Sequence, residues 1–91
     1  MKTIDFVRDH KSVIGAVLAQ YHVRNPRYVP DESEEAEVIL LVQPEQAVSY
    51  FDVFKMEDEL TAELHAKVTI LTEGALKGSY RERILSIAEK V

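Results

Sequence analysis

Two short apolar segments, separated by a segment long enough for a helix, constrain the fold of this chain most. Residues 39–42 read Ile-Leu-Leu-Val, and residues 68–72 read Val-Thr-Ile-Leu-Thr. Short runs rich in β-branched and other apolar residues are typical of buried strands. The segment between them, about residues 47–65, carries apolar residues at helical intervals. Because a helix of this length permits a crossover connection, the order predicts a strand–helix–strand unit.

The N-terminal part of the chain is predicted to form a helix and a short strand. Apolar residues recur at intervals of three and four over about residues 4–21, and Thr3 is suited to cap the first turn. The helix is expected to end near His22, because an Asn-Pro pair follows and proline disfavours helical backbone before it. Residues 27–29 are expected to form a strand that Pro30 ends or confines to an edge of the sheet.

The middle of the chain is predicted to hold an acidic loop, a strand and a long helix. Residues 31–37 carry five carboxylates, and like charges so close together favour a solvated loop. A strand is expected over residues 37–42. In the helix over residues 47–65, acidic side chains are expected to face solvent and apolar ones the core. The expected core residues of this helix are Phe51, Val53, Met56, Leu60 and Leu64.

A final helix over about residues 79–89 completes the predicted elements. It is expected to bury Ile84, Leu85 and either Ile87 or Ala88, and to expose Arg81 and Arg83. The resulting order of elements predicts an α/β or α+β fold, with a small mixed sheet of three or more strands covered by helices on one face. The length favours one domain over residues 1–91.

Composition excludes several classes of function. The formal charge of −5 argues against direct nucleic-acid binding, which needs clustered Lys and Arg. The absence of cysteine excludes disulfides and thiolate metal sites. No apolar run approaches the roughly 20 residues needed to span a bilayer, so no membrane association is expected. The first residues lack an apolar signal region, and the cytoplasm is therefore the expected location.

Several stretches, in the right order along the chain, resemble the minimal nucleotidyltransferase domains of the DNA-polymerase-beta-like superfamily. Residues 21–27 read YHVRNPR where family members run YGVRNVR, and residues 39–42 match the tail of the family's DIDLLV. Residues 50–53 resemble its LFDL. Residues 67–76, KVTILTEGAL, are similar to KVDLVTEGAL, and residues 81–85 to RERIL. The resemblance covers most of the chain and implies a nucleotidyltransferase-like fold.

The resemblance also implies a set of catalytic motifs, from which this sequence departs. In the family, a Gly-Ser turn after the first strand holds nucleotide phosphates through its N–H groups. Two aspartates on the second strand and one on the third hold divalent metal for transfer. Here Pro30 and Asp31 stand where the turn should be, and proline has no N–H to donate. The three aspartate positions align with Glu37, Ile39 and Thr69.

These departures predict the loss of metal-dependent transfer. Glu37 and Ile39 are two residues apart and share one side of a strand, so Ile39 places hydrocarbon where metal should bind. Losing a single electrostatic partner at such a centre commonly costs two or three decades in rate. We therefore expect no catalytic residue, no cofactor-binding residue and no metal ligand in this chain.

Three histidines and two aromatic residues are the remaining candidates for a site. His10, His22 and His65 lie far apart in the sequence without an obvious second ligand, so no catalytic role is expected for them. His22 stands where family members often carry a helix-ending glycine, which predicts a C-terminal cap. Tyr50 and Phe54 are candidate partner contacts, because exposed aromatic side chains can anchor a partner. A place at the edge of the core is the alternative for Phe54.

The resemblance implies a partner as well. Minimal nucleotidyltransferase domains are often paired with a small helical HEPN protein, typically an RNA-cleaving toxin, for which they serve as antitoxin. The leading hypothesis is a catalytically degenerate member that acts by protein binding, as antitoxin or regulatory subunit of such a protein. One alternative is an active enzyme that uses ATP and Mg²⁺ to transfer a nucleotide to its partner. A second alternative is a structural homodimer.

Overall fold

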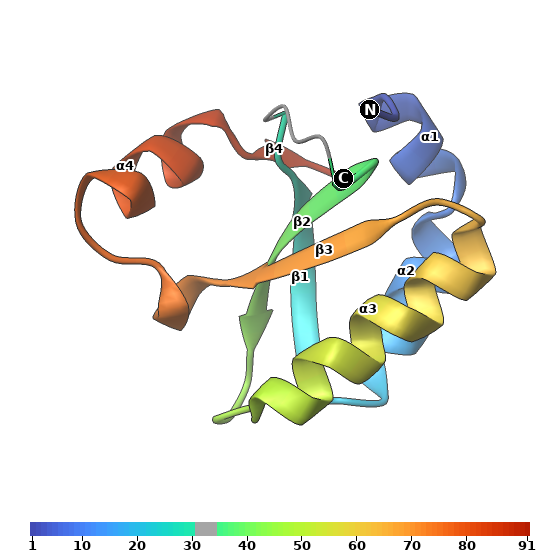
Figure 1. Ribbon diagram of the computed structural model, residues 1–91, viewed down its shortest axis with the longest axis horizontal. Helices are drawn as coiled ribbons and strands as arrows, with labels where there is room; N and C mark the ends of the chain where they lie inside the picture. The colour runs from blue at the N-terminus through green and yellow to red at the C-terminus, as the bar shows by residue number, and fades with distance from the viewer. Residues whose placement is uncertain (31–34) are drawn as a thin grey trace.

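A mixed sheet forms the centre of the molecule (Figure 1). The computed structural model describes residues 1–30 and 35–91, and within these residues the sheet has four strands in the order β3-β2-β1-β4. The strands are β1 (Val23–Tyr28), β2 (Val38–Pro44), β3 (Val68–Thr72) and β4 (Glu89–Lys90). β2 runs parallel to β3 and antiparallel to β1, which in turn pairs antiparallel with β4. The predicted mixed sheet and the crossover between β2 and β3 are confirmed.

Both faces of β2 are covered, which explains its unbroken apolar sequence. Val38, Leu40 and Val42 belong to a core shared with the helices α1 (Ile4–Asp9), α2 (Lys11–Ala19) and α3 (Tyr50–Leu64). Ile39 and Leu41 point to the other face and join a second cluster that includes Ile84 of α4 (Gly78–Ile87). Figure 1 shows α4 on one side of the sheet and α2 and α3 on the other. The prediction of helices on one face only was therefore wrong, because alternate residues of β2 are apolar on both sides.

The N-terminal helical segment consists of two helices, α1 (Ile4–Asp9) and α2 (Lys11–Ala19), where one continuous helix was predicted. The cap by Thr3 is confirmed, since its side chain accepts a hydrogen bond from the Phe6 N–H. The break comes at His10. Its Nδ1 lies 2.8 Å from the Phe6 carbonyl oxygen, the acceptor that the His10 N–H would use in an unbroken helix. That N–H bonds to Val7 O instead.

Strand β1 begins earlier than predicted because a bulge accommodates its proline. The pairing with β2 shifts register between Arg24 and Arg27, so Asn25 and Pro26 lie in the irregular part. Asn25 has a positive φ of 55°, a conformation that asparagine tolerates better than most residues. A bulge is one of the few places within a sheet where the missing N–H of proline is harmless. His22, in the turn before the strand, has a φ of 58°, but the C-cap of α2 is Gln20, two residues earlier than predicted.

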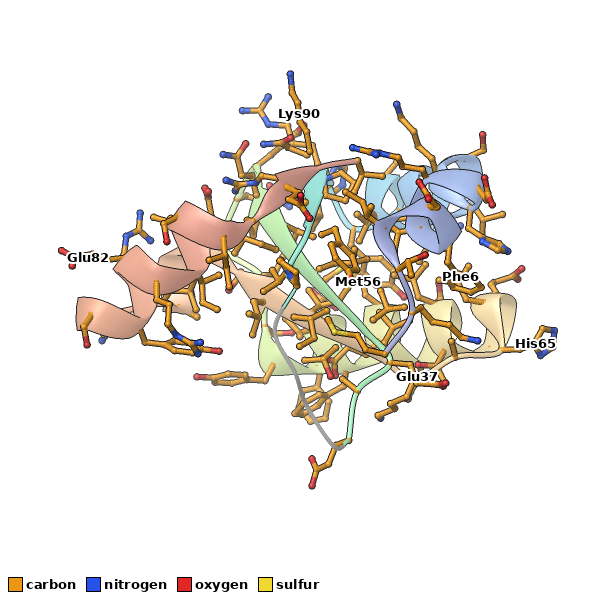
Figure 2. All side chains as sticks on the ribbon, turned by 90° about the horizontal axis from the view of Figure 1, so that it is seen from above. Phe6, Glu37, Met56, His65, Glu82 and Lys90 are labelled. Atoms are coloured by element: carbon orange, nitrogen blue, oxygen red, sulfur yellow. The ribbon has the colours of Figure 1, made fainter. Side chains whose placement is uncertain are left out.

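Helix α3 (Tyr50–Leu64) connects the parallel strands β2 and β3. Ser49 caps it by accepting a hydrogen bond from Asp52 N–H at 3.2 Å, so the helix begins three residues later than predicted. Met56, Leu60 and Leu64 are buried as expected, and Figure 2 shows Met56 inside the molecule.

Phe51 is the exception in the predicted core of α3, because 77% of its surface is exposed. It precedes Met56 by five residues, and at 3.6 residues per turn this places it on the side of α3 away from the core. The prediction that Phe51 packs in the core was wrong.

The C-terminal part contains a short 3-10 helix, η1 (Glu73–Ala75), then α4 (Gly78–Ile87) and β4. Ile84 is fully buried, whereas the neighbouring apolar residues of this segment are half-buried. Arg83 is exposed, but Arg81 is half-buried and donates a hydrogen bond to Glu73 O, which corrects its predicted exposure. Every helix in the described ranges is too short or too polar to cross a bilayer.

Candidate functional site

The fold brings together the three positions that the resemblance aligned with metal-binding aspartates. Ile39 on β2 and Thr69 on β3 are direct partners across the parallel pair. Glu37 immediately precedes β2, two residues before Ile39, and its backbone N–H bonds to Lys67 O at the start of β3. The predicted proximity of these positions is therefore present, at the N-terminal ends of two neighbouring strands.

Ile39 is packed in hydrocarbon at this place. Only 7% of its surface is exposed. In the described part of the chain, it belongs to an apolar cluster whose members come from the segments just after β1 and just before β2, from β2 and from the C-terminal part of the chain. Its buried members are Val29, Ala36, Ile39, Leu41, Leu76 and Ile84. A divalent cation bound here would have to replace its hydration shell with side chains that offer no oxygen.

The side chains at the other two aligned positions, Glu37 and Thr69, do not make up for the missing metal ligand. Oε2 of Glu37 accepts a hydrogen bond from the Lys67 N–H at 3.0 Å, so the carboxylate is used to fasten the start of β3. Thr69 is half-buried and offers a single hydroxyl. Among the described residues, no three His, Cys, Asp or Glu side chains gather closely enough to hold a metal ion. The residues that the structure describes at this place therefore do not fit the metal centre of a nucleotidyltransferase; Asp31 lies outside them.

Comparison with known proteins supports the fold. A solved structure described as a "putative minimal nucleotidyltransferase" superimposes with a TM-score of 0.77, covering 99% of this chain and 97% of that chain at 20% sequence identity. The chain has the minimal nucleotidyltransferase fold. No protein-family model and no curated protein sequence matches it. At this level of identity the nucleotidyltransferase fold is shared, and the chemistry depends on which side chains the fold presents.

The three histidines occupy separate places on this nucleotidyltransferase fold. His10 lies between α1 and α2 and bonds to Phe6 O. His22 lies in the turn between α2 and β1, His65 is the C-cap of α3, and both have left-handed backbone. They therefore serve as local turn residues in three different parts of the chain.

An ion pair that the sequence analysis did not single out lies at the opposite ends of the strands. Arg27 of β1 donates a hydrogen bond to the carboxylate of Glu73, and Arg81 of α4 donates to the Glu73 carbonyl oxygen. The side chains of Arg27 and Glu73 are 18% and 24% exposed. Forty-six residues separate the two partners, so local pattern could not pair them. The one sequence feature that could have drawn attention to Glu73 is its place in residues 72–76, TEGAL, which are part of the stretch that resembles the family.

This ion pair makes the stability of the protein depend on pH in the acidic range. The hydrogen bond from Arg27, helped by Gln43 and by the charges of Arg27 and Arg81, lowers the pKa of Glu73 below its ordinary value of 4.5, while burial opposes the shift. A lowered folded-state pKa stabilises the protein above pH 4.5, and this contribution is lost as the pH falls through the folded-state pKa.

We therefore expect Glu73→Gln to lower the free energy of unfolding at pH 7 by about 1–3 kcal/mol, the value of a hydrogen bond to a charged group. The variant should also lose less stability than the wild type between pH 5 and pH 3. Urea denaturation across this pH range measures both. Glu82→Gln, at an exposed position of α4, is the control and should follow the wild type. Parallel pH profiles for Glu73→Gln and the wild type would contradict the assignment.

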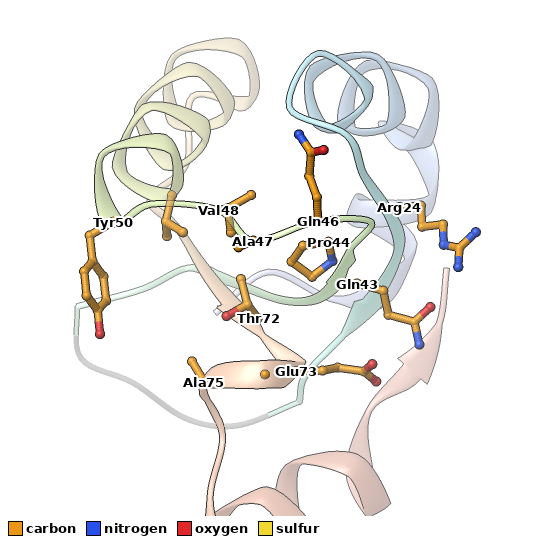
Figure 3. Close-up of a pocket in the computed structure, with 12 residues that line it drawn as sticks. Arg24, Gln43, Pro44, Gln46, Ala47, Val48, Tyr50, Thr72, Glu73 and Ala75 are labelled. Atoms are coloured by element: carbon orange, nitrogen blue, oxygen red, sulfur yellow. The ribbon is translucent and has the colours of Figure 1, made fainter.

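A pocket of about 670 Å³ adjoins the same ends of β2 and β3 (Figure 3). It is separated from the Glu37 end by the length of the strands. Figure 3 shows Tyr50 on one side of the pocket and Arg24 and Gln43 on the other. The lining residues come from β1, from β2 and the segment after it, from α3, and from the end of β3 with η1. They are Arg24, Gln43, Pro44, Gln46, Ala47, Val48, Tyr50, Val53, Thr72, Glu73, Gly74 and Ala75.

Both predicted partner contacts lie on the surface. Tyr50 is 79% exposed and Phe54 57% exposed, so the alternative of a place at the edge of the core does not hold for Phe54. Phe51 joins them, and sequence reasoning missed it because it was assigned to the core. The exposure makes these side chains available for contact, and the partner itself remains a prediction.

Proposed function

We propose that this protein is a catalytically degenerate member of the minimal nucleotidyltransferases that works by binding another protein. The observation that carries the proposal is Ile39, buried in an apolar cluster at the position where the chemistry needs a metal-binding carboxylate. A site that keeps one of three carboxylates lacks the oxygen ligands needed to gather the cations that neutralise a triphosphate. The fold then serves as a surface that binds another protein, and this function needs no cofactor.

The partner in this proposal is a small helical HEPN-type RNase, for which the chain acts as antitoxin or regulatory subunit in the cytoplasm. The resemblance suggests this partner class, and the charge of the chain supports it. An RNA-cleaving protein needs a basic cleft, and a chain with a formal charge of −5 is electrostatically complementary to such a cleft. The proposed action is occlusion, in which the bound chain covers the RNase cleft of its partner.

Nucleotide binding gives the first test. We expect millimolar ATP with Mg²⁺ to leave the melting temperature unchanged, because a ligand stabilises a fold only in proportion to its binding to the folded state. The measurement is a thermal melt with ATP and Mg²⁺, with ATP alone and with Mg²⁺ alone. A rise seen only when both are present would contradict the loss of the metal centre.

Inhibition of an RNase gives the second test. The gene beside that of this chain is examined for a short helical protein with an Arg-x-x-x-x-His motif, and the two proteins are produced together and separately. We expect equimolar addition of the chain to stop RNA cleavage by the partner in the absence of ATP and Mg²⁺. Unchanged cleavage at saturating amounts of the chain would reject the antitoxin role.

One observation favours a residual enzyme as the second candidate. Glu37 keeps a carboxylate at the first metal position, and further acidic residues precede it in the sequence. If these bind Mg²⁺, the chain would transfer a nucleotide from ATP to a side chain of its partner. Incubation of both proteins with labelled ATP and Mg²⁺ decides between the candidates. We expect no label, and strong labelling that disappears in Glu37→Gln would establish the enzyme instead.

A further inference from the structure

Three large aromatic side chains are exposed together at the start of α3. Tyr50, Phe51 and Phe54 are 79%, 77% and 57% exposed, and we call them the aromatic patch. Tyr50 and Phe54 are four residues apart, and Phe51 and Phe54 three, so the three side chains share one side of the helix. Contiguous exposed aromatic surface is unusual on a free-standing domain and often marks an interaction site.

The aromatic patch is continuous with the pocket at the ends of β2 and β3. Tyr50 belongs to both, and Val53 of α3 also lines the pocket. Pro44, Ala47 and Val48 supply further apolar lining. An incoming chain can therefore place one apolar side chain in the pocket while it covers the aromatic patch. A small molecule in the pocket alone would leave Phe51 and Phe54 exposed and unexplained.

The same helix is acidic beyond the aromatic patch. Asp58 lies four residues after Phe54 and seven after Phe51, which places it on the same side of α3. Asp58 is exposed, whereas Glu63 lies nine residues after Phe54 and therefore faces the opposite side of α3. Over residues 50–64 the helix carries five carboxylates and one lysine. The side of α3 that carries the aromatic patch thus becomes acidic at Asp58, about 6 Å further along the helix.

The sheet edge next to α3 is not available for strand pairing. On β3, the Val68 N–H donates to Thr61 Oγ1 at 3.0 Å and the Ile70 N–H donates to Glu57 Oε2 at 2.8 Å. These donors are the groups that an added strand would need. A partner at this side of the molecule must therefore be held by side chains.

We propose that the aromatic patch, the pocket and Asp58 of α3 together bind one helix of a different protein. This deepens the proposed function and rests on it. The partner helix carries an apolar residue for the pocket, apolar residues for Phe51 and Phe54, and a Lys or Arg residue opposite Asp58. A second copy of this chain is a poor occupant, because its α3 carries five carboxylates and only one lysine to pair with them.

Site-specific crosslinking locates the contact. A photoreactive phenylalanine analogue replaces Phe54 in one version of the full chain and Tyr80, an aromatic residue of α4 that is 45% exposed, in another. Both are produced in the native cells and irradiated. We expect position 54, and not position 80, to crosslink to a peptide of another protein that is rich in Lys and Arg and has one apolar face. Crosslinking at 54 to a second copy of this chain, or to an acidic peptide, would overturn the proposal.

Affinity measurements with the purified crosslinked protein then test which residues bind. We expect Phe51→Ser and Phe54→Ser each to weaken binding by about tenfold or more, as aromatic anchors do. The matched control, Tyr80→Ser, should bind within about twofold of the wild type. Asp58→Lys should slow association and reduce its dependence on salt. Thermal melts verify that every variant is folded.

The outcomes separate this inference from the proposed function. If the partner binds and is inhibited, but the variants of the aromatic patch bind like the wild type, the docking surface is wrong and the function stands. If the variants of the aromatic patch lose binding to a partner that has no RNase activity, the docking surface is right and the function is wrong.

Discussion

Replacing Ile39 with aspartate is expected to destabilise the protein severely and to create no metal site. Aspartate is the residue that the nucleotidyltransferase pattern has at this position, so the change restores the family sequence at one place. It also puts a carboxylate into the apolar cluster formed with Leu41, Leu76 and Ile84, and none of these side chains can supply a counter-charge. An uncompensated buried charge costs about 3–5 kcal/mol. That is a large part of the stability of a domain of this size, at about 0.1 kcal/mol per residue.

Urea denaturation with and without Mg²⁺ measures this effect. Ile39→Val is the matched control, because it removes one methylene and keeps the site apolar, and we expect it to cost about 0.5–1.5 kcal/mol. We also expect Mg²⁺ to leave the unfolding midpoint of Ile39→Asp where it is. If the aspartate variant were as stable as the valine variant, or were stabilised by Mg²⁺, the site would be more open and polar than the structure shows.

Opening the edge of β3 is expected to have the second largest effect. Thr61→Val and Glu57→Met remove the two side-chain oxygens that accept the outward N–H groups of Val68 and Ile70. Each replacement nearly keeps the size of the side chain, so the main change is a partly buried donor without its acceptor, at about 1–3 kcal/mol each. The double variant should lose about 2–4 kcal/mol. It should also associate with itself, because an open strand edge pairs with other edges.

Equilibrium unfolding and sedimentation velocity give the two readouts. The control is Glu63→Met, at an exposed position of the same helix, which we expect to change stability by less than about 0.5 kcal/mol. If the double variant had the stability and the sedimentation behaviour of the wild type, water would be hydrogen-bonding to the N–H groups of Val68 and Ile70 as well as the side chains of α3 do.

The sequence predicted which positions meet at the candidate site, but not what surrounds them. Aligned with the family pattern, the sequence places Ile39 and Thr69 where aspartates should be, and the register of β2 and β3 confirms that these two residues are neighbours. The contact between Arg27 and Glu73 was out of reach, because it joins residues that are distant in the chain. Phe51 was wrongly assigned to the core, because the spacing of apolar residues along a helix defines the ends of its buried side only to within about one residue.

Local sequence was sufficient wherever an element is decided by its own residues. β2 and β3 are short runs of mostly apolar residues, which favour a buried strand. Thr3 caps α1 by accepting a hydrogen bond from a residue only three positions away. The parallel crossover followed from the length of the helix between the strands. For these parts the physical cause lies within a few residues along the chain.

Tertiary structure decided everything that depends on neighbours from elsewhere in the chain. It placed α4 on the second face of β2, where Ile84 and Ile39 belong to one apolar cluster. It left Phe51 and Phe54 without a covering element, and it closed the edge of β3 with Thr61 and Glu57. Burial and hydrogen-bond satisfaction are properties of the packed molecule, so a residue's type shows its preference and only its surroundings determine whether that preference is met.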